Sequence, residues 1–331
     1  MQRDGQAAGD ERTGLRGELR GARGGDAAAR AEAWDGRLDD RCSADVRCGK
    51  NRAEVGRMTF VHHPAPAAIP AAGDLGLVIQ GDRMLARPEV AEGVVLPEFG
   101  VLAGGDGSVA PPLHVGRLEG RVCWLVTVED RDAPPPDGWA WHETRALLSV
   151  FTAAQAHAVN CARQLQWWDR RHRFCGACGA ETTAVQEERA RRCPRCAAVF
   201  FPVASSAIIV AVTRGDELLL AHNRNFRTGM YSLLAGFVDP GEALEQAVRR
   251  EVREEAGIEI DDLRYVASEP WSFPNSLMIG FRARHLRGEL MVDGKEIERA
   301  GWFGRAALPE VPRRGSLARR LIDQWLAERG A

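Results

Sequence analysis

Hydrophobic and polar positions divide the 331-residue chain into segments of different kinds. From about Phe60 to Asp137, short apolar runs such as LGLVIQ, GVVLPEFGVLA and RVCWLVTVE are separated by glycine and proline, which predicts strands of a small β-rich domain. The proline-rich PPPDG at 134–138 marks a linker. Apolar residues at helical spacing then predict a long helix from about Glu143 to Trp168.

Strand and helix patterns alternate beyond residue 203. SSAIIVAVT and DELLLAH predict a strand pair, and a glycine-bounded helix follows. SLMIGFRARH and AGWF predict further strands before a C-terminal helix from about Ser316. Such alternation indicates a single α/β domain.

The first 57 residues differ from the rest of the chain. They are rich in Arg, Asp, Ala and Gly, and their large apolar residues are little more than Leu15, Leu19, Trp34 and Leu38. A segment with so little apolar surface cannot offset the entropy of ordering. We therefore expect residues 1–57 to be a disordered tail or a mis-assigned start, with Met58 as the alternative start.

Composition narrows the class of protein. A formal net charge of −2 gives no general attraction to nucleic acid or to anionic membranes. No run approaches the roughly 18 apolar residues of a membrane helix, and the N-terminus lacks a signal-peptide pattern. We expect a cytoplasmic protein without a membrane partner.

Four of the eight cysteines form two CxxC pairs, Cys175 with Cys178 and Cys193 with Cys196. Two such knuckles can place four thiolates tetrahedrally around Zn²⁺. A redox role for one pair is the alternative, but paired knuckles favour one structural zinc, because four cysteine ligands leave no open position for water. The arginines nearby fit either nucleic-acid contact or a solvated basic surface: Arg171, Arg173, Arg191, Arg192 and Arg195.

The stretch GFVDPGEALEQAVRREVREEAGIEI, residues 236–260, predicts an amphipathic helix with a carboxylate cluster. Glu251, Glu254 and Glu255 stand at i, i+3 and i+4, so they share one face. Beside them runs an apolar ridge that should pack on the sheet: Leu244, Val248, Val252 and Ala256. Taken alone, the pattern fits a surface helix with Arg–Glu pairs, or a cluster of oxygen ligands for Mg²⁺ or Mn²⁺.

SEPWSFPNS, residues 268–276, holds two prolines and two large aromatic residues. Pro270 and Pro274 cannot both lie comfortably in a helix or a central strand, so we expect a stiff loop. Trp271 and Phe273 then either fill the edge of the core or form a pocket wall for a flat ligand.

The glutamate-rich helix matches every fixed position of the Nudix box, GX5EX7REUXEEXGU with U aliphatic. The matching residues are Gly236, Glu242, Arg250, Glu251, Val252, Glu254, Glu255, Gly257 and Ile258. SEPWSFPNS resembles the SQPWPFPxS motif that follows the box in the NADH pyrophosphatase family of Nudix hydrolases. Glu269 replaces the usual Gln there, and Ser272 the usual Pro.

The resemblance implies a Nudix α/β/α sandwich with a mixed sheet, preceded by a zinc ribbon and a small β-rich N-terminal domain. The implied boundaries are 58–138 for the β-rich domain, 139–170 for a helical connector, 171–200 for the zinc ribbon and 203–331 for the Nudix domain.

Carried over by position, the implied Mg²⁺ or Mn²⁺ ligands are Glu251, Glu255, Glu296 and the carbonyl of Ala235. Glu254 and Arg250 complete the implied catalytic set, with Arg250 orienting a ligand glutamate. The implied substrate-binding residues are Glu269, Pro270, Trp271, Ser272, Phe273, Pro274, Asn275, Ser276, Ala318, Phe237, Phe201, Glu188 and Arg145, with Phe201 donated across a homodimer.

The activity implied by the resemblance is hydrolysis of the pyrophosphate bond of NAD(H), giving nicotinamide mononucleotide and AMP. Alternatives within the same chemistry are removal of NAD caps from RNA 5′ ends and cleavage of another nucleoside diphosphate derivative such as ADP-ribose. A catalytically inactive nucleotide sensor is a third hypothesis, against which the intact glutamate set argues.

Overall fold

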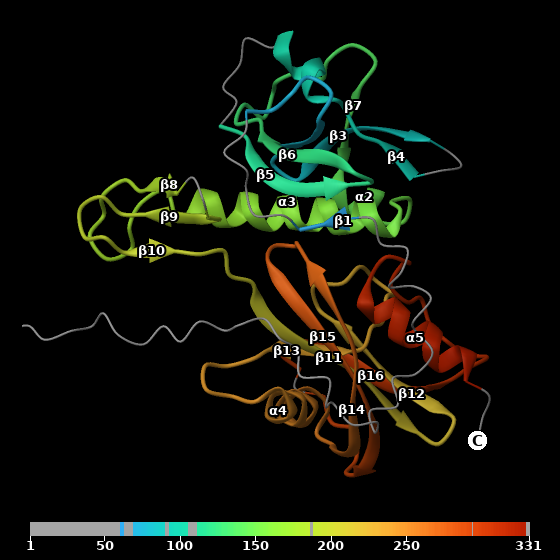
Figure 1. Cartoon of the computed structure of the whole chain (residues 1–331). Coiled ribbons are helices and arrows are strands. Elements are labelled where there is room, and N and C mark those ends of the chain that lie inside the picture. The colour runs from blue at the N-terminus through green and yellow to red at the C-terminus, as the bar shows by residue number, and fades with distance from the viewer. Residues whose placement is uncertain are drawn as a thin grey trace, which may run out of the picture. The chain divides into compact units, whose positions relative to one another are not determined.

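The computed structural model describes residues 60–62, 69–89, 93–104, 111–185, 188–292 and 294–328 (Figure 1). The expectation for residues 1–57 lies outside this part of the chain. Within it, no helix combines the length and the apolar character needed to cross a membrane.

The N-terminal region forms the predicted β-rich unit. Its sheet has the order β1-β5-β6-β2-β3-β4, with β7 paired to β3, and β2 runs parallel to β6. One face of the sheet packs against helix α3 through a shared apolar cluster that includes Leu77, Leu125 and Ala158. The elements are β1 (Phe60–Val61), β2 (Leu75–Gln80), β3 (Arg83–Glu89), β4 (Gly93–Val95), η1 (Phe99–Gly104), β5 (Leu113–Leu118), β6 (Arg121–Thr127) and β7 (Ala140–Glu143).

The single long helix predicted from Glu143 is wrong in its first part, where only residues 144–147 are helical. The chain forms strand β7, the short helix α2 (Thr144–Leu147) and then helix α3 (Ala153–Arg171). The Thr152 hydroxyl accepts a hydrogen bond from the Gln155 N–H, and the Gln155 side chain accepts one from the Thr152 N–H. This capping box starts a new helix, because it satisfies backbone donors that have no partner in the first turn.

Three short strands follow α3 in the order β10-β9-β8. They carry the two CxxC knuckles. Their bounds are β8 (Thr183–Val185), β9 (Ala190–Arg192) and β10 (Val199–Phe200).

The C-terminal region is a three-layer sandwich. Its mixed sheet has the order β14-β15-β11-β12-β16, with β13 paired to β11, and β11 runs parallel to β15. Helices α4 and α5 lie on opposite faces of this sheet (Figure 1). The elements are β11 (Ser205–Arg214), β12 (Glu217–Asn223), β13 (Leu234–Phe237), α4 (Leu244–Ala256), β14 (Glu259–Trp271), β15 (Ser276–Arg287), β16 (Ile297–Gly304) and α5 (Leu317–Ala327).

Strand β11 is apolar at every position of its central part, residues 207–212. Ile208 and Val210 pack in the cluster under α4, whereas Ile209 and Ala211 pack in the cluster under α5. A strand covered on both faces buries every side chain, and each large apolar side chain contributes about 1.5–3 kcal/mol. The sandwich agrees with the predicted fold class.

The segment 268–276 is not a loop over its whole length. Strand β14 extends through Pro270 to Trp271, Pro270 lies opposite Leu277, and β15 begins at Ser276. Pro270 is tolerated because β14 is the edge strand of the sheet, where a missing N–H breaks no ladder on the open side. Only residues 272–275 form the turn.

Candidate active site and zinc ribbon

Helix α4 carries the candidate catalytic carboxylates and is fixed at both ends. The Gln246 side chain accepts the Ala243 N–H at 2.8 Å, and Gly257 ends the helix with φ +71° and an N–H bond to the Arg253 carbonyl. Val248, Val252 and Ala256 are buried against the sheet, as the apolar ridge predicted. The carboxylate face is therefore held at a set rotation about the helix axis.

Arg250 connects four groups of the predicted box. Its guanidinium makes two bonds of 2.8 Å with the carboxylate of Glu242, a third of 2.8 Å with Glu251 and a fourth of 3.1 Å with Glu254. It also donates to the Phe237 carbonyl at 2.9 Å. Arg250 therefore holds the carboxylates in position and links α4 to the end of β13. Arg250 is a positioning residue, because it acts through these carboxylates.

Glu251 lies against the backbone of β13. A Cβ atom at position 236 would be 2.0 Å from the Glu251 carboxyl carbon, so a side chain there would overlap the carboxylate. Glycine at 236 is thus required by a close approach between β13 and Glu251. The neighbouring Ala235, whose carbonyl is a predicted metal ligand, pairs with Ile209 of β11.

The three box glutamates differ in exposure. The Glu254 side chain is 60% exposed, whereas that of Glu251 is 13% exposed and Glu255 is buried. Glu296 lies just before β16. Among the residues that the structure describes, the ligand atoms of these glutamates do not gather as tightly as the cysteine sulfurs, which are within 4.8 Å of one another.

The electrostatics fit a divalent cation at these glutamates. Burial raises the pKa of Glu251, Arg250 opposes that rise, and the charges of Glu254 and Glu296 add to it. Carboxylates that repel one another in a partly buried place are the oxygen donors that Mg²⁺ and Mn²⁺ prefer. Glu251, Glu255, Glu296 and the Ala235 carbonyl thus remain the predicted ligand set.

Helix α3 anchors the turn at 272–275. The Asn160 side chain accepts the Ser272 N–H at 3.2 Å, Arg163 donates to the Ser272 carbonyl, and Gln164 donates to the Ser276 carbonyl at 2.9 Å. Asn275 also donates to the Val203 carbonyl at 2.7 Å. Ser272, Asn275 and Ser276 are buried, and the hydrogen bonds above give them an anchoring role. Their contact with substrate stays a prediction.

The two aromatic residues of this segment pack edge to face, with ring centroids 5.1 Å apart. The Arg145 guanidinium lies 5.8 Å from each ring, and that of Arg163 lies 4.8 Å from the Phe273 ring. Trp271 and Phe273 are only half-buried, so neither is a plain core side chain. Arg145, predicted from the resemblance, is thus brought to Trp271 and Phe273.

The remaining candidates are spread over several elements. Ala318 is buried on α5, and burial raises the pKa of Glu269, while the charge of Arg320 on α5 lowers it. Phe201 and Phe237 are exposed by 55% and 57%, as stacking partners would be. Glu188 is exposed, in the turn before β9.

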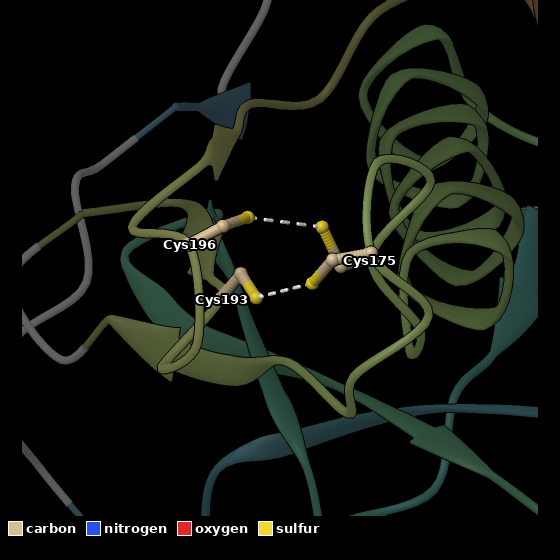
Figure 2. A group of neighbouring side chains, drawn as sticks. Cys175, Cys193 and Cys196 are labelled. Atoms are coloured by element: carbon tan, nitrogen blue, oxygen red, sulfur yellow. Dashed lines mark hydrogen bonds between the residues drawn. The ribbon is translucent and has the colours of Figure 1, made fainter.

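The four predicted zinc ligands converge (Figure 2). The sulfurs of Cys175 and Cys196 are 3.5 Å apart, as are those of Cys178 and Cys193. Tetrahedral Zn²⁺–thiolate bonds require about 3.8 Å between sulfurs, so small shifts accommodate the ion. Hydrogen bonds from backbone N–H groups, of which that of Cys196 has the largest effect, lower the pKa of Cys193 to about 6. A lower pKa favours the thiolate.

Both knuckles have the same backbone. Gly179 donates to the Cys175 carbonyl at 2.8 Å, and Ala197 donates to the Cys193 carbonyl at 3.0 Å. Gly179 and Ala197 both have positive φ, of 74° and 61°. This repeated turn aims two sulfurs from each knuckle at one point and supports the structural zinc.

Comparison with known proteins gives three consecutive matches to family models. They are the NADH pyrophosphatase-like rudimentary NUDIX domain over 73–168, the NADH pyrophosphatase zinc ribbon domain over 170–201 and the NUDIX domain over 203–326. A relative named NAD-capped RNA hydrolase NudC, from Pseudomonas syringae pv. syringae (strain B728a), is 43% identical over 261 residues, which is 79% of this chain and 92% of the relative. This chain belongs to the NADH pyrophosphatase family of Nudix hydrolases.

Two further relatives of this Nudix hydrolase carry the same name. The protein of Pseudomonas aeruginosa (strain LESB58) is 43% identical over 215 residues, and that of Stutzerimonas stutzeri (strain A1501) is 43% identical over 216 residues. Each alignment covers 65% of this chain and 77% of the relative. The predicted hydrolase class and zinc ribbon are confirmed, and the β-rich domain is a rudimentary Nudix domain, which its sequence had not revealed.

Sequence reasoning missed the residues of this Nudix hydrolase that hold others in place. Asn160, Arg163 and Gln164 bind a turn that lies 109–112 residues away in the chain. Asn160 and Arg163 are buried, which only the fold shows, so no direct sequence signal pointed to them. A buried polar residue needs a partner, although the sequence does not say which.

Proposed function

We propose that this Nudix hydrolase cleaves the pyrophosphate bond of NAD(H) and releases nicotinamide mononucleotide and AMP. The observation that carries the proposal is the network on α4, in which Arg250 holds Glu251 against Gly236 and links it to Glu242. Such a network fixes carboxylates at the accuracy that phosphate chemistry requires. An inactive nucleotide sensor would have no need of it.

In the proposed reaction, water attacks one phosphorus atom and the bridging P–O bond breaks. A divalent cation bound to Glu251, Glu255, Glu296 and the Ala235 carbonyl would supply charge neutralisation and a more acidic water. The chain's own part is to keep the carboxylates in place through Arg250 and the buried ridge of α4. Glu255 is the residue we assign to help activate the water, since it is buried one turn after Glu251.

The segment 269–276 is proposed to bind the dinucleotide. Trp271 and Phe273 expose part of their rings beside Arg145, and the turn is anchored to α3. An anchored aromatic surface loses little entropy when a base or nicotinamide ring stacks on it. Ala318, Phe237, Phe201 and Glu188 stay in the proposed site from the resemblance.

The test is hydrolysis of NADH, NAD⁺ and ADP-ribose by purified protein with Mn²⁺ or Mg²⁺. Glu255→Gln keeps the shape of the side chain and removes its charge, so we expect at least roughly a hundredfold loss in kcat. Glu245→Gln, in the exposed first turn of the same helix, is the matched control and should keep wild-type activity.

Fold and zinc content should be unchanged in both variants, as measured by circular dichroism and metal analysis. Partial recovery of Glu255→Gln at high Mn²⁺ would indicate weakened metal binding. Near wild-type turnover by Glu255→Gln would place the metal site elsewhere, and no turnover of any dinucleotide by the wild-type protein would refute the activity.

A second candidate function is removal of NAD caps from RNA, in which the same bond is cleaved in a larger substrate. Its support is the name that the relatives carry, NAD-capped RNA hydrolase, and a group of arginines beside the 272–275 turn. We also propose a homodimer in which Phe201 of one copy reaches the site of the other.

A further inference from the structure

A cavity of about 690 Å³ lies beside the turn at 272–275. Helix α3 forms much of its wall, and none of the four predicted metal-ligand residues lines it. The cavity is therefore distinct from the carboxylate site, although Phe273 and Pro274 form part of its lining.

Positive charge dominates this cavity. Five arginines line it, from the segment after β6, from α2 and from α3, against two carboxylates, Asp82 and Glu143: Arg131, Arg145, Arg163, Arg170 and Arg171. Arg163 pairs with Asp82 at 2.9 Å and is buried. Arg131, Arg170 and Arg171 are exposed and form no ion pair with any residue that the structure describes.

Two aromatic rings of the cavity lie beside these arginines. The guanidinium of Arg171 lies 4.3 Å from the Trp167 ring, and that of Arg163 lies 4.8 Å from the Phe273 ring. Aromatic rings and guanidinium planes stack on nucleic-acid bases, and free guanidinium groups bind phosphates. A single phosphate would engage one or two arginines, whereas a chain of nucleotides would use charges from three parts of the fold.

We propose that this cavity binds single-stranded RNA, with phosphates on Arg131 and Arg170 and a base against Phe273. The link to a cap rests on the proposed function: RNA that continues from a dinucleotide held at the 269–276 segment would pass Phe273 into the cavity. The binding itself does not depend on which dinucleotide is cleaved.

Two of the arginines near the zinc ribbon are less suited to binding RNA. Arg191 bonds Asp169 at 2.6 Å and also Thr182, and Arg173 pairs with Glu129 at 3.2 Å. Charges already paired with carboxylates add little to the attraction for a phosphate. Arg173 and Arg191 are thus less suited to a phosphate than the exposed arginines of the cavity, whereas Arg192 and Arg195 are exposed, and the control variant below tests Arg192.

Binding is measured without catalysis by leaving out Mg²⁺ and Mn²⁺, with no chelator so that the ribbon keeps its zinc, and with a fluorescent, unstructured 5′-phosphorylated RNA of about ten nucleotides. The double variant Arg131→Gln/Arg170→Gln removes two exposed charges. We expect its Kd to rise about tenfold and the slope of log K against log salt to become shallower by about 1.4, since each single-strand phosphate contact contributes about 0.7.

The matched control is Arg117→Gln/Arg192→Gln, which removes two exposed arginines outside the cavity. Its Kd should stay within about twofold of wild type. An equal loss in both double variants, or RNA binding too weak to measure in the wild-type protein, would overturn the proposal.

Activity then separates this inference from the proposed function. Arg131→Gln/Arg170→Gln should hydrolyse NADH like the wild type, and its kcat/KM on NAD-capped RNA should fall about tenfold, because only the longer substrate reaches the cavity. RNA binding through the cavity without NADH cleavage would refute the proposed function alone. NADH cleavage with RNA binding that ignores Arg131 and Arg170 would refute this inference alone.

Discussion

At the scale of single residues, glycine at 236 matters because it has no side chain. The carboxyl group of Glu251 occupies the space that a Cβ atom would need, and Arg250 holds that carboxyl group from the other side. Glu251 is thus confined between a backbone and a guanidinium. The close approach of the Glu251 carboxylate explains why this position of the Nudix box is glycine in this chain.

Gly236→Ala should therefore damage catalysis without unfolding the protein. The new methyl group must displace the Glu251 carboxylate, and a shift of about 1 Å in a catalytic group can cost about a hundredfold in rate. We expect a loss of that order in kcat for NADH, with near-UV circular dichroism unchanged. Gly304→Ala is the control, since a Cβ atom there meets nothing within 4 Å; equal losses in both variants would contradict the explanation.

At the scale of elements, the parts that the sequence predicted well are those set by neighbours along the chain. The bounds and buried ridge of α4 and the two knuckles follow from residues within a few turns of one another. The break before α3 escaped prediction because apolar residues continue at helical spacing across Thr152, where a capping box starts a new helix. The extension of β14 through Pro270 depends on its place at the sheet edge, which is a tertiary fact.

The zinc ribbon gives a prediction of its own. Cys175 is a buried member of the sulfur cluster, so Cys175→Ser leaves three thiolates and should release the metal. We expect metal analysis to fall from about one zinc per chain toward zero, with a lower Tm, because binding free energy of such a site is folding free energy. Cys161→Ala lies outside the ribbon and should keep its zinc. Full zinc occupancy in a Cys175/Cys193 double variant would contradict the assignment.

At the scale of the whole molecule, the proposed site draws on three segments that are far apart in the sequence. Helix α3 anchors the turn through Arg163, α4 supplies Glu251 and Glu255, and Arg145 of α2 faces Trp271. No local pattern predicts that α3, in the rudimentary Nudix domain, binds a turn of the catalytic domain. Arg145 was predicted from the family resemblance, whereas Arg163 was identified only from the tertiary structure.

The proposed dimer adds a fourth contributor, Phe201, and combining two impaired variants in one dimer tests in which copy's site its ring acts. Phe201→Ala should lower kcat/KM by removing a stacking surface worth about 1–3 kcal/mol, and Glu255→Gln should be nearly inactive. If Phe201 acts across the dimer, a heterodimer of these two variants keeps one complete site. Random pairing then gives about a quarter of wild-type activity, since half of the dimers are mixed and each has one of two sites.

The mixed sample is made by co-expression, and its mass is measured by light scattering against twice the 36.2 kDa of one chain. Separately expressed variants, assayed at the same total concentration, are the control. Because Val203, two residues after Phe201, already contacts Asn275 of its own chain, action within one copy is the physical alternative. Activity of the co-expressed sample no higher than the mean of the two separate variants would place Phe201 in the site of its own chain.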